Sequence, residues 1–263
     1  MAKPTIILTR ADIAEHVDPT QAITLIEQAM AEHEKGEDYL PPKAIYADLP
    51  VGTSGLAAAA CITGITKLAG LMTMKVGQER TDNPTQNLPT TNSWTLTFDP
   101  ATGELLMFSD GTMPTMLRTA AAAAVATRHL ARPDARTLAV IGAGQLGRQC
   151  TRLVSTVRQF ERVLLHDHQA EVAEAAAAEL ASLITVPVEP ADARAACEQA
   201  DVIITATNST EPIVMADWVR PGTHLSCMGS DLHQKIECEM SLLPACRRFA
   251  DQTEHAAQRG EVS

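Results

Sequence analysis

The 263-residue chain has few aromatic side chains, no long apolar run and no excess of basic residues. Hydrophobic residues nevertheless make up 45% of it, which is enough to bury one large core or two modest ones. The formal net charge is −11, which argues against a nucleic-acid groove and against an anionic membrane surface as partner. No stretch approaches the roughly 18 apolar residues of a membrane span.

Targeting and metal-binding patterns are also missing. The first residues, MAKPTIILTRADIAEH, lack the basic flank, the long apolar region and the cleavage site of a secretory signal peptide. The six cysteines include no CxxC pair, so the sequence predicts no structural zinc site and no metal. Without a secretory signal, we expect a cytoplasmic protein with reduced thiols rather than three disulfides.

The first part of the chain combines helical and strand patterns. Asp18 is suited to cap a helix, Pro19 fits its first position and Gly36 provides a stop. Alternating apolar side chains predict strands over 66–76 and 94–98. The turn sequence DPATG then leads into another strand, ELLMFSD. We therefore expect helices packed with an antiparallel sheet.

An alanine-rich helix over about 114–130 follows and is ended by Arg132-Pro133. Small side chains allow such a helix to pack closely between two bodies, so the domain junction is expected here, with domains at 1–116 and 117–263.

From residue 137 onward, strand and helix patterns alternate. The candidate strands are TLAVI, RVLLH, TVPVE, DVIITAT and THLSCMG. Such alternation predicts an α/β fold with a doubly wound parallel sheet, the Rossmann type, in the second domain.

The segment LAVIGAGQLGRQC predicts a dinucleotide site. Gly142 permits a tight turn, Gly144 lets the backbone approach a pyrophosphate, and Gly147 lets the helix pack on the strand. Asp167 ends the next strand, where an acid can bind the ribose 2′-hydroxyl and disfavours a 2′-phosphate. We therefore expect NAD rather than NADP. The alternative is a tight turn in an α/β domain that binds no nucleotide.

Two later segments place polar residues where ligands bind in open α/β sheets, beyond the carboxyl ends of the strands. DVIITATNST brings Thr207 there, and HLSCMGSDLHQK brings Asp231 and then Lys235. Asp231 is the candidate general acid/base facing a nicotinamide, and a helix-capping aspartate is the alternative interpretation.

Three cations are candidates for binding substrate: Lys43, Lys75 and Arg118. Lys75 ends a strand whose other face is apolar, and Arg118 opens the alanine-rich helix. Two cations that converge on a cleft suit a carboxylate, whereas each alone is equally suited to a solvated surface.

Several motifs together resemble the ornithine cyclodeaminase/mu-crystallin family. They are TRADI, PPK, MKVGQERTDNPTQNLPT, DPATGELL, LRTAAAAAVATRHLARPDA, VIGAGQLGRQ, TATNSTEPIV, WVRPGTH and GSDLHQK. The resemblance implies a homodimeric NAD(P)-dependent enzyme. Its N-terminal α+β domain would bind substrate and form the dimer, and its Rossmann domain would bind the nucleotide.

The resemblance also implies residue roles. Lys75 and Arg118 would bind the substrate carboxylate, with Lys43 in the PPK motif, and Asp231 would be the acid/base. The cofactor contacts would be Thr90, Gly142, Gly144, Gln145, Leu146, Gly147, Asp167, Thr207 and Lys235.

The implied reaction is hydride transfer from Cα of an L-amino acid to NAD through an imine. In a cyclodeaminase the side-chain amine attacks the imine, ammonia leaves and the hydride returns. In an alanine-dehydrogenase type, water attacks instead and NADH accumulates. The alternatives are a ketimine or imine reductase and a non-catalytic, mu-crystallin-like binding protein whose ligand binding depends on the nucleotide.

Three departures from the family pattern refine this expectation. Lys43 stands where the family usually has arginine, which weakens bidentate carboxylate recognition. No acid lies between Asp48 and Glu79, where ornithine-specific members place a glutamate, which favours a neutral or apolar substrate side chain. Family members usually continue beyond the segment equivalent to 247–263, so we expect either a longer natural chain or the loss of that segment.

Overall fold

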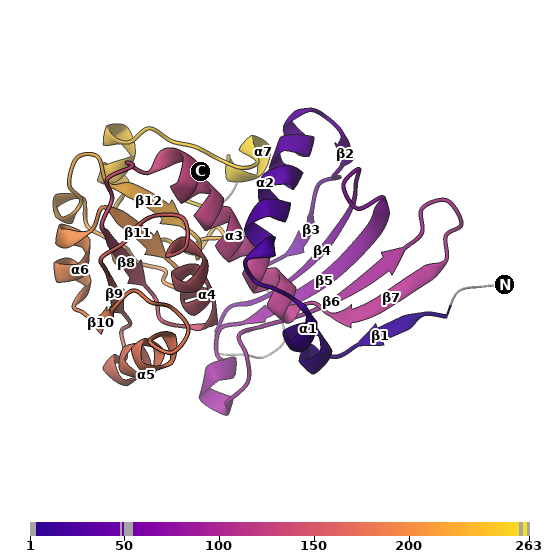
Figure 1. Cartoon of the computed structure of the whole chain (residues 1–263), viewed down its shortest axis with the longest axis horizontal. Helices are drawn as coiled ribbons and strands as arrows, with labels where there is room; N and C mark the ends of the chain where they lie inside the picture. The colour runs from indigo at the N-terminus through magenta and orange to yellow at the C-terminus, as the bar shows by residue number, and fades with distance from the viewer. Residues whose placement is uncertain (1–3, 48, 50–54, 258–259, 262–263) are drawn as a thin grey trace. The chain divides into compact units, whose positions relative to one another are not determined.

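The computed structural model of the chain describes residues 4–47, 49, 55–257 and 260–261. The chain divides into two compact units, Met1–Met116 and Leu117–Ser263 (Figure 1). Helix α3, Thr112–Leu130, begins in the first unit and continues into the second. None of the helices within the described residues is long and apolar enough to cross a membrane.

The first unit is built on a sheet of seven described strands in the order β1-β7-β6-β5-β4-β2, with β3 also paired to β4. Only β1 is parallel to its neighbour, β7, and the other pairings are antiparallel. The strands are β1 Ile6–Leu8, β2 Asp38–Tyr39, β3 Ala44–Tyr46, β4 Ala57–Thr66, β5 Leu71–Arg80, β6 Thr91–Phe98 and β7 Leu105–Asp110. The expected antiparallel pairing is confirmed for all of these strands except β1, whose parallel pairing with β7 makes the sheet mixed.

Two helices of this unit, α1 Arg10–His16 and α2 Gln21–Glu34, precede most of the sheet. The start of α2 differs from the prediction, since the helix begins at Gln21 after Thr20. The carboxylate of Asp18 accepts hydrogen bonds from the N–H and hydroxyl of Thr20, so Asp18 closes a preceding turn instead of capping the helix. The predicted end of the helix at Gly36 is confirmed. Gly36 follows the C-cap residue Lys35 and has the positive φ, 66°, that commonly ends a helix.

The predicted strand over 66–76 was placed too early. Residues 67–70 form the turn between β4 and β5, and Gly70 has the positive φ of 61° that this tight turn requires. The alternation is real from Met72 onward, within β5. Strand β4 was not predicted, because its sequence AAAACITGIT has no apolar-polar alternation.

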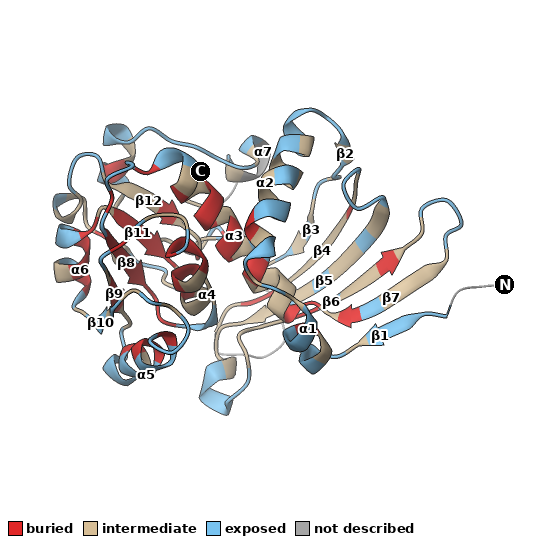
Figure 2. Ribbon diagram, viewed as in Figure 1, coloured by how far each residue is buried: buried red, intermediate tan, exposed pale blue. Residues whose placement is uncertain are grey.

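One face of the first sheet carries apolar side chains in register across three strands. Val76 pairs with Trp94, and Met74 lies beside Leu96, which in turn pairs with Phe108. Val76, Trp94 and Phe108 are all exposed to solvent in the single chain, and the sheet of this unit has few of the buried residues drawn red in Figure 2. An apolar sheet face of this kind is typical of an interaction surface.

The second unit contains a five-stranded, all-parallel sheet in the order β10-β9-β8-β11-β12. Its strands are β8 Thr137–Ile141, β9 Arg162–His166, β10 Val188–Pro190, β11 Val202–Thr205 and β12 His224–Cys227. The central strands β8 and β11 are buried throughout, as parallel strands covered by helices on both faces are (Figure 2). The doubly wound α/β fold is confirmed.

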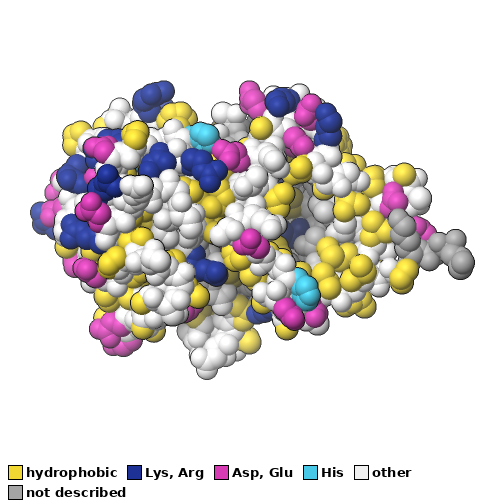
Figure 3. Space-filling model, in the orientation of Figure 1, with side chains coloured by type: hydrophobic (Ala, Val, Ile, Leu, Met, Phe, Trp, Pro, Cys, Tyr) yellow, Lys and Arg dark blue, Asp and Glu magenta, His cyan; other side chains and the backbone are white. Residues whose placement is uncertain are grey.

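Helices and short turns complete the two units. They are α4 Gln145–Val154, α5 Ala170–Leu180, α6 Ala193–Gln199 and α7 Thr253–Ala256, with the 3-10 turns η1 Asn83–Gln86, η2 Ala216–Trp218 and η3 Met240–Ala245. On the face drawn in Figure 3, basic and acidic side chains alternate over the second unit. Such mixing is expected where arginines are engaged in ion pairs with neighbouring acids.

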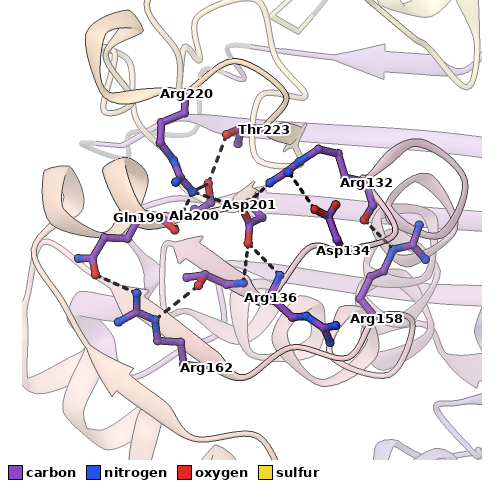
Figure 4. A network of polar contacts seen from close by, with 11 residues as sticks. Arg132, Asp134, Arg136, Arg158, Arg162, Gln199, Ala200, Asp201, Arg220 and Thr223 are labelled. Carbon is purple, nitrogen blue, oxygen red and sulfur yellow. Dashed lines mark hydrogen bonds and ion pairs between the residues drawn. The ribbon is translucent and has the colours of Figure 1, made fainter.

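One of these networks surrounds Asp201, which directly precedes β11 (Figure 4). Its carboxylate accepts hydrogen bonds from the backbone N–H of Arg136 and Thr137, at 2.8 and 3.0 Å, which joins β11 to the start of β8. Arg132 and Arg220 contact the other oxygen, at 2.6 and 3.3 Å. Burial alone would raise the pKa of Asp201, but these hydrogen bonds and cations outweigh it and lower the pKa.

We predict that Asp201→Asn lowers the free energy of unfolding at pH 7 by about 2 kcal/mol, because the amide cannot accept from both N–H groups and both arginines. A lowered folded pKa stabilises the protein above the unfolded value of about 3.9, and this contribution is lost as pH falls through the folded value. Urea unfolding at pH 7 and at pH 3 should therefore show a penalty that shrinks in acid.

Asp134→Asn is the matched control, since Asp134 pairs with the same Arg132 from an exposed position. Its effect should stay below about 0.5 kcal/mol at either pH. Equal penalties for the two variants would contradict the role given to Asp201.

Candidate functional site

The glycine turn between β8 and α4 is formed by close backbone packing. Gly142 has a φ of 105° and donates its N–H to His166 O at 2.8 Å. A Cβ on Gly142 would lie 2.5 Å from Ala206 O, and a Cβ on Gly147 would overlap Gly142 O. Both positions therefore exclude any side chain, for the reasons that the sequence predicted.

Gly144 differs from these two glycines, because nothing lies within 4 Å of the position that its Cβ would take. It is the N-cap of α4, which has no side-chain cap, and both Gly144 and Gln145 are exposed. The first N–H groups of α4 thus face open space. A helix amino terminus with uncapped N–H groups and no side chain in front can accommodate a pyrophosphate. The local structure of the turn therefore fits a dinucleotide.

Asp167 follows β9 and contacts this turn. One carboxylate oxygen accepts from Ala143 N at 2.9 Å, and the other accepts from Gln169 N at 3.1 Å. His168 Nδ1 lies 3.0 Å from the second oxygen. The side chain is 11% exposed, so Asp167 anchors the turn from a largely buried position. Its contact with a ribose stays a prediction, as do those of Gln145 and Leu146.

Thr207 lies just beyond β11, and its partner is a residue that sequence reasoning missed. Glu237 is fully buried and accepts hydrogen bonds from the N–H and the hydroxyl of Thr207, at 2.7 and 2.9 Å. It also accepts from the hydroxyl of Thr205 and from Gly229 N, at 2.7 and 2.9 Å. Burial raises the pKa of Glu237, and these four hydrogen bonds oppose the rise.

The segment after β12 brings Asp231 and Lys235 together. Lys235 Nζ lies 2.8 Å from Asp231 Oδ1, with the lysine side chain 2% exposed and the aspartate side chain 61% exposed. A buried ammonium thus supports an accessible carboxylate, which is the arrangement expected of an oriented acid/base. Lys235 was predicted to contact the cofactor, and in this structure it contacts Asp231.

Arg118 lies in the second turn of α3 and is exposed. Loss of hydration lowers the pKa of Arg118, and the carboxylates of Asp251 and Asp231 act in the opposite direction. Because arginine stays protonated in proteins, the guanidinium is charged at neutral pH despite this lowering. Arg118 and Asp231 therefore lie within electrostatic reach of one another.

In the first unit, Lys75 projects from β5 and donates to Thr115 Oγ1 at 3.2 Å. Lys75 pairs across the sheet with Ile62 of β4. Lys43 precedes Ala44, which pairs with Cys61, so continuing the register places Lys43 beside Ile62. The two lysines are therefore separated by two strand spacings, about 10 Å.

Thr90 directly precedes β6, and its carbonyl accepts from Arg80 N at 2.9 Å. The register places it near the end of β5, beyond Glu79, so it is not beside Lys75. Its role as a cofactor contact stays a prediction. Among the residues described, no three His, Cys, Asp or Glu side chains gather to hold a metal ion.

The parallel sheet, its glycine turn and the acid after β9 together define an α/β protein of the dinucleotide-binding class. An α+β unit precedes this dinucleotide-binding unit in the chain. A family model described as "Ornithine cyclodeaminase/mu-crystallin family" matches residues 3–263. The chain belongs to this family, as the sequence motifs predicted.

Relatives with assigned activities span most of the chain. It is 29% identical to alanine dehydrogenase of Archaeoglobus fulgidus, over 98% of this chain and 77% of that protein. It is 30% identical to iminosuccinate reductase of Paracoccus denitrificans, over 97% and 78%. Among solved structures, Thermococcus litoralis Δ1-pyrroline-2-carboxylate reductase in complex with NADH and L-proline matches with a TM-score of 0.92 and 26% identity, over 98% and 79%.

We predict opposite outcomes for two alanine substitutions in the glycine turn. Gly144→Ala should keep the free energy of unfolding within about 1 kcal/mol of wild type, because its Cβ meets open space, yet should weaken NADH binding about tenfold or more. Gly147→Ala should destabilise the second unit by about 3 kcal/mol, because its Cβ overlaps Gly142 O. Urea unfolding and NADH fluorescence titration measure both. Unchanged NADH binding by Gly144→Ala would contradict the proposed cradle.

Proposed function

We propose that the protein is an NAD-dependent oxidoreductase that acts at Cα of a small, uncharged L-amino acid or of the corresponding 2-imino acid, through an imine. The observation that carries this proposal is the Asp231–Lys235 pair, an accessible carboxylate supported by a buried ammonium at the carboxyl edge of a Rossmann sheet. The relatives named alanine dehydrogenase and iminosuccinate reductase support the same class of reaction.

NAD is the proposed cofactor. The open amino terminus of α4 would bind its pyrophosphate, and Asp167 would bind the ribose and repel a 2′-phosphate. Thr90, Gln145, Leu146 and Thr207 are the further proposed contacts. When bound, the nicotinamide supplies a hydride acceptor for the substrate Cα–H, and its reduced form supplies the hydride for an imine.

The cations would recognise the carboxylate that every 2-amino acid carries. Arg118 offers a planar fork that can bind both oxygens, whereas Lys75 and Lys43 each offer a single charged group. The hydroxyl of Thr115 contacts Lys75 Nζ at 3.2 Å and so restricts its direction. With the carboxylate fixed, the orientation of Cα and its amine is fixed as well.

Asp231 would move protons on the substrate amine or on the attacking water. Lys235 Nζ lies 2.8 Å from Asp231 Oδ1, and this contact holds the carboxylate in one orientation. The exposure of Asp231 gives it access to a ligand. Lys235 is therefore proposed as the residue that orients the acid/base, in addition to its expected place near the cofactor.

The strand beside Lys75 favours a small, uncharged substrate side chain. Ala58, Ala60 and Ile62 of β4 share the face of Lys75, since Ile62 pairs with it and alternate residues share a face. A diamino acid would need an acid for its second amine, and the sequence has none between residues 49 and 78. Oxidative deamination or imine reduction is therefore favoured over cyclodeamination.

The open apolar face of the first sheet supports a homodimer. Three apolar side chains of this face are exposed in the single chain, those of Val76, Trp94 and Phe108. Val76 pairs directly with Trp94, and Phe108 pairs with Leu96, two residues beyond Trp94 on the same strand. Two copies of this face brought together would remove this apolar surface from water. We propose that the first unit forms the dimer and holds the substrate, while the second binds NAD.

The test is one assay that follows NADH absorbance and ammonia release together, with purified protein, NAD and a panel of L-amino acids. Alanine and other small apolar amino acids should release ammonia and NADH in equal amounts, because water completes the reaction. Ornithine and lysine should give little of either. Ammonia without NADH would indicate cyclodeamination and contradict this proposal.

In the same assay, Asp231→Asn should lower kcat by about 100-fold or more with the best substrate, because the amide cannot accept a proton. Asp217→Asn is the matched control, since Asp217 is an exposed aspartate of the same unit, and it should keep wild-type turnover. Full turnover by Asp231→Asn would show that Asp231 is not the acid/base of the reaction.

A further inference from the structure

The buried carboxylate of Glu237 is unexplained by the roles proposed so far. It is fully buried and, among the described residues, forms no ion pair. An ionised carboxylate without a cation is costly to bury, and an apolar side chain of similar size would fill the space at less cost. A group retained at such a cost points to a requirement for a fixed geometry.

The donors to Glu237 come from the ends of two neighbouring strands. Thr205 ends β11 and Thr207 follows it, while Gly229 follows β12. Each carboxylate oxygen accepts one backbone N–H, from Thr207 at 2.7 Å and from Gly229 at 2.9 Å. One side chain thereby joins the segment proposed to contact the cofactor to the segment that carries Asp231.

Gly229 confirms how closely these segments approach. A Cβ at this position would overlap Thr207 O and would lie 2.5 Å from Glu237 Oε1. No residue except glycine therefore permits the hydrogen bond from Gly229 N to Glu237. Glu237 therefore fixes the position of Gly229, the first residue of the GSDLHQK motif.

The loop between these two anchors holds the acid/base. Glu237 is two residues beyond Lys235, and Gly229 is two residues before Asp231. Ser230 Oγ donates to Lys235 O at 2.6 Å, and Lys235 Nζ contacts Asp231 at 2.8 Å. The loop is thus closed at its base by the side chain of Glu237 and across its middle by these contacts of Lys235 with Ser230 and Asp231.

We propose that Glu237 is a positioning residue for the reaction, which fixes the 229–236 loop so that Asp231 meets the substrate beside the cofactor. This inference rests on the proposed function, since it assigns Glu237 a catalytic effect through Asp231. Glu237 itself touches no substrate, because its carboxylate is enclosed by Thr205, Thr207 and Gly229.

The test compares Glu237→Gln with Glu239→Gln. The amide has one oxygen, so one of the two backbone N–H groups would face its NH2 group, and the loop would lose an anchor. Glu239 lies two residues further on, and within the described part of the chain its carboxylate accepts from Ala216 N and Ser241, outside the loop. It therefore controls for the loss of a carboxylate in the same segment.

Two readouts are needed. Hydrogen–deuterium exchange of the peptide covering 228–236 should become about tenfold faster or more in Glu237→Gln, with the core strand β8 unchanged. The value of kcat, normalised to NADH-binding sites, should fall about 100-fold, with the KM for the amino acid within about threefold. Glu239→Gln should match wild type in both.

Thr205→Val provides a second variant if Glu237→Gln does not fold, because it removes one buried hydroxyl donor and keeps both backbone anchors. It should lower kcat less than Glu237→Gln does, with the same unchanged KM. Unchanged exchange in Glu237→Gln, or faster exchange with wild-type kcat, would overturn the inference. A wild-type protein that turns over no amino or imino acid would instead overturn the proposed function, while exchange would still decide whether Glu237 anchors the loop.

Discussion

The structure of the second unit depends on close backbone packing at the carboxyl edge of its parallel sheet. Gly142 and Gly147 pack without side chains at the end of β8, and Gly229 packs without one against Thr207 at the end of β11. The buried carboxylate of Glu237 accepts the N–H groups that this packing brings inside. Where backbone segments approach so closely, a bound ligand meets N–H groups and fixed loops rather than mobile side chains.

The two units contribute different kinds of chemistry. The second unit presents the N–H groups of α4, the exposed carboxylate of Asp231 and the guanidinium of Arg118. The first unit presents Lys75 among small apolar residues of β4, on a sheet whose opposite face is apolar and open.

Patterns that are local in sequence predicted the structure well, and contacts between distant segments escaped prediction. The glycine turn, Asp167 and the five parallel strands each follow from a local pattern. Strand β4 was missed because alanine-rich sequence shows no alternation, and the turn at 67–70 was read as strand because its residues continue the alternation. Glu237 was missed because glutamate is normally exposed, and its burial results from donors located 8–32 positions away along the chain.

The most direct test of the account is to follow the hydrogen on Cα. The protein would be incubated with NAD and the best small L-amino acid deuterated at Cα, and the reduced cofactor analysed by mass spectrometry. The account predicts that the deuterium is found in the reduced cofactor, because hydride passes directly between Cα and the nicotinamide. Deuterium released to water, with no label in the cofactor, would contradict it.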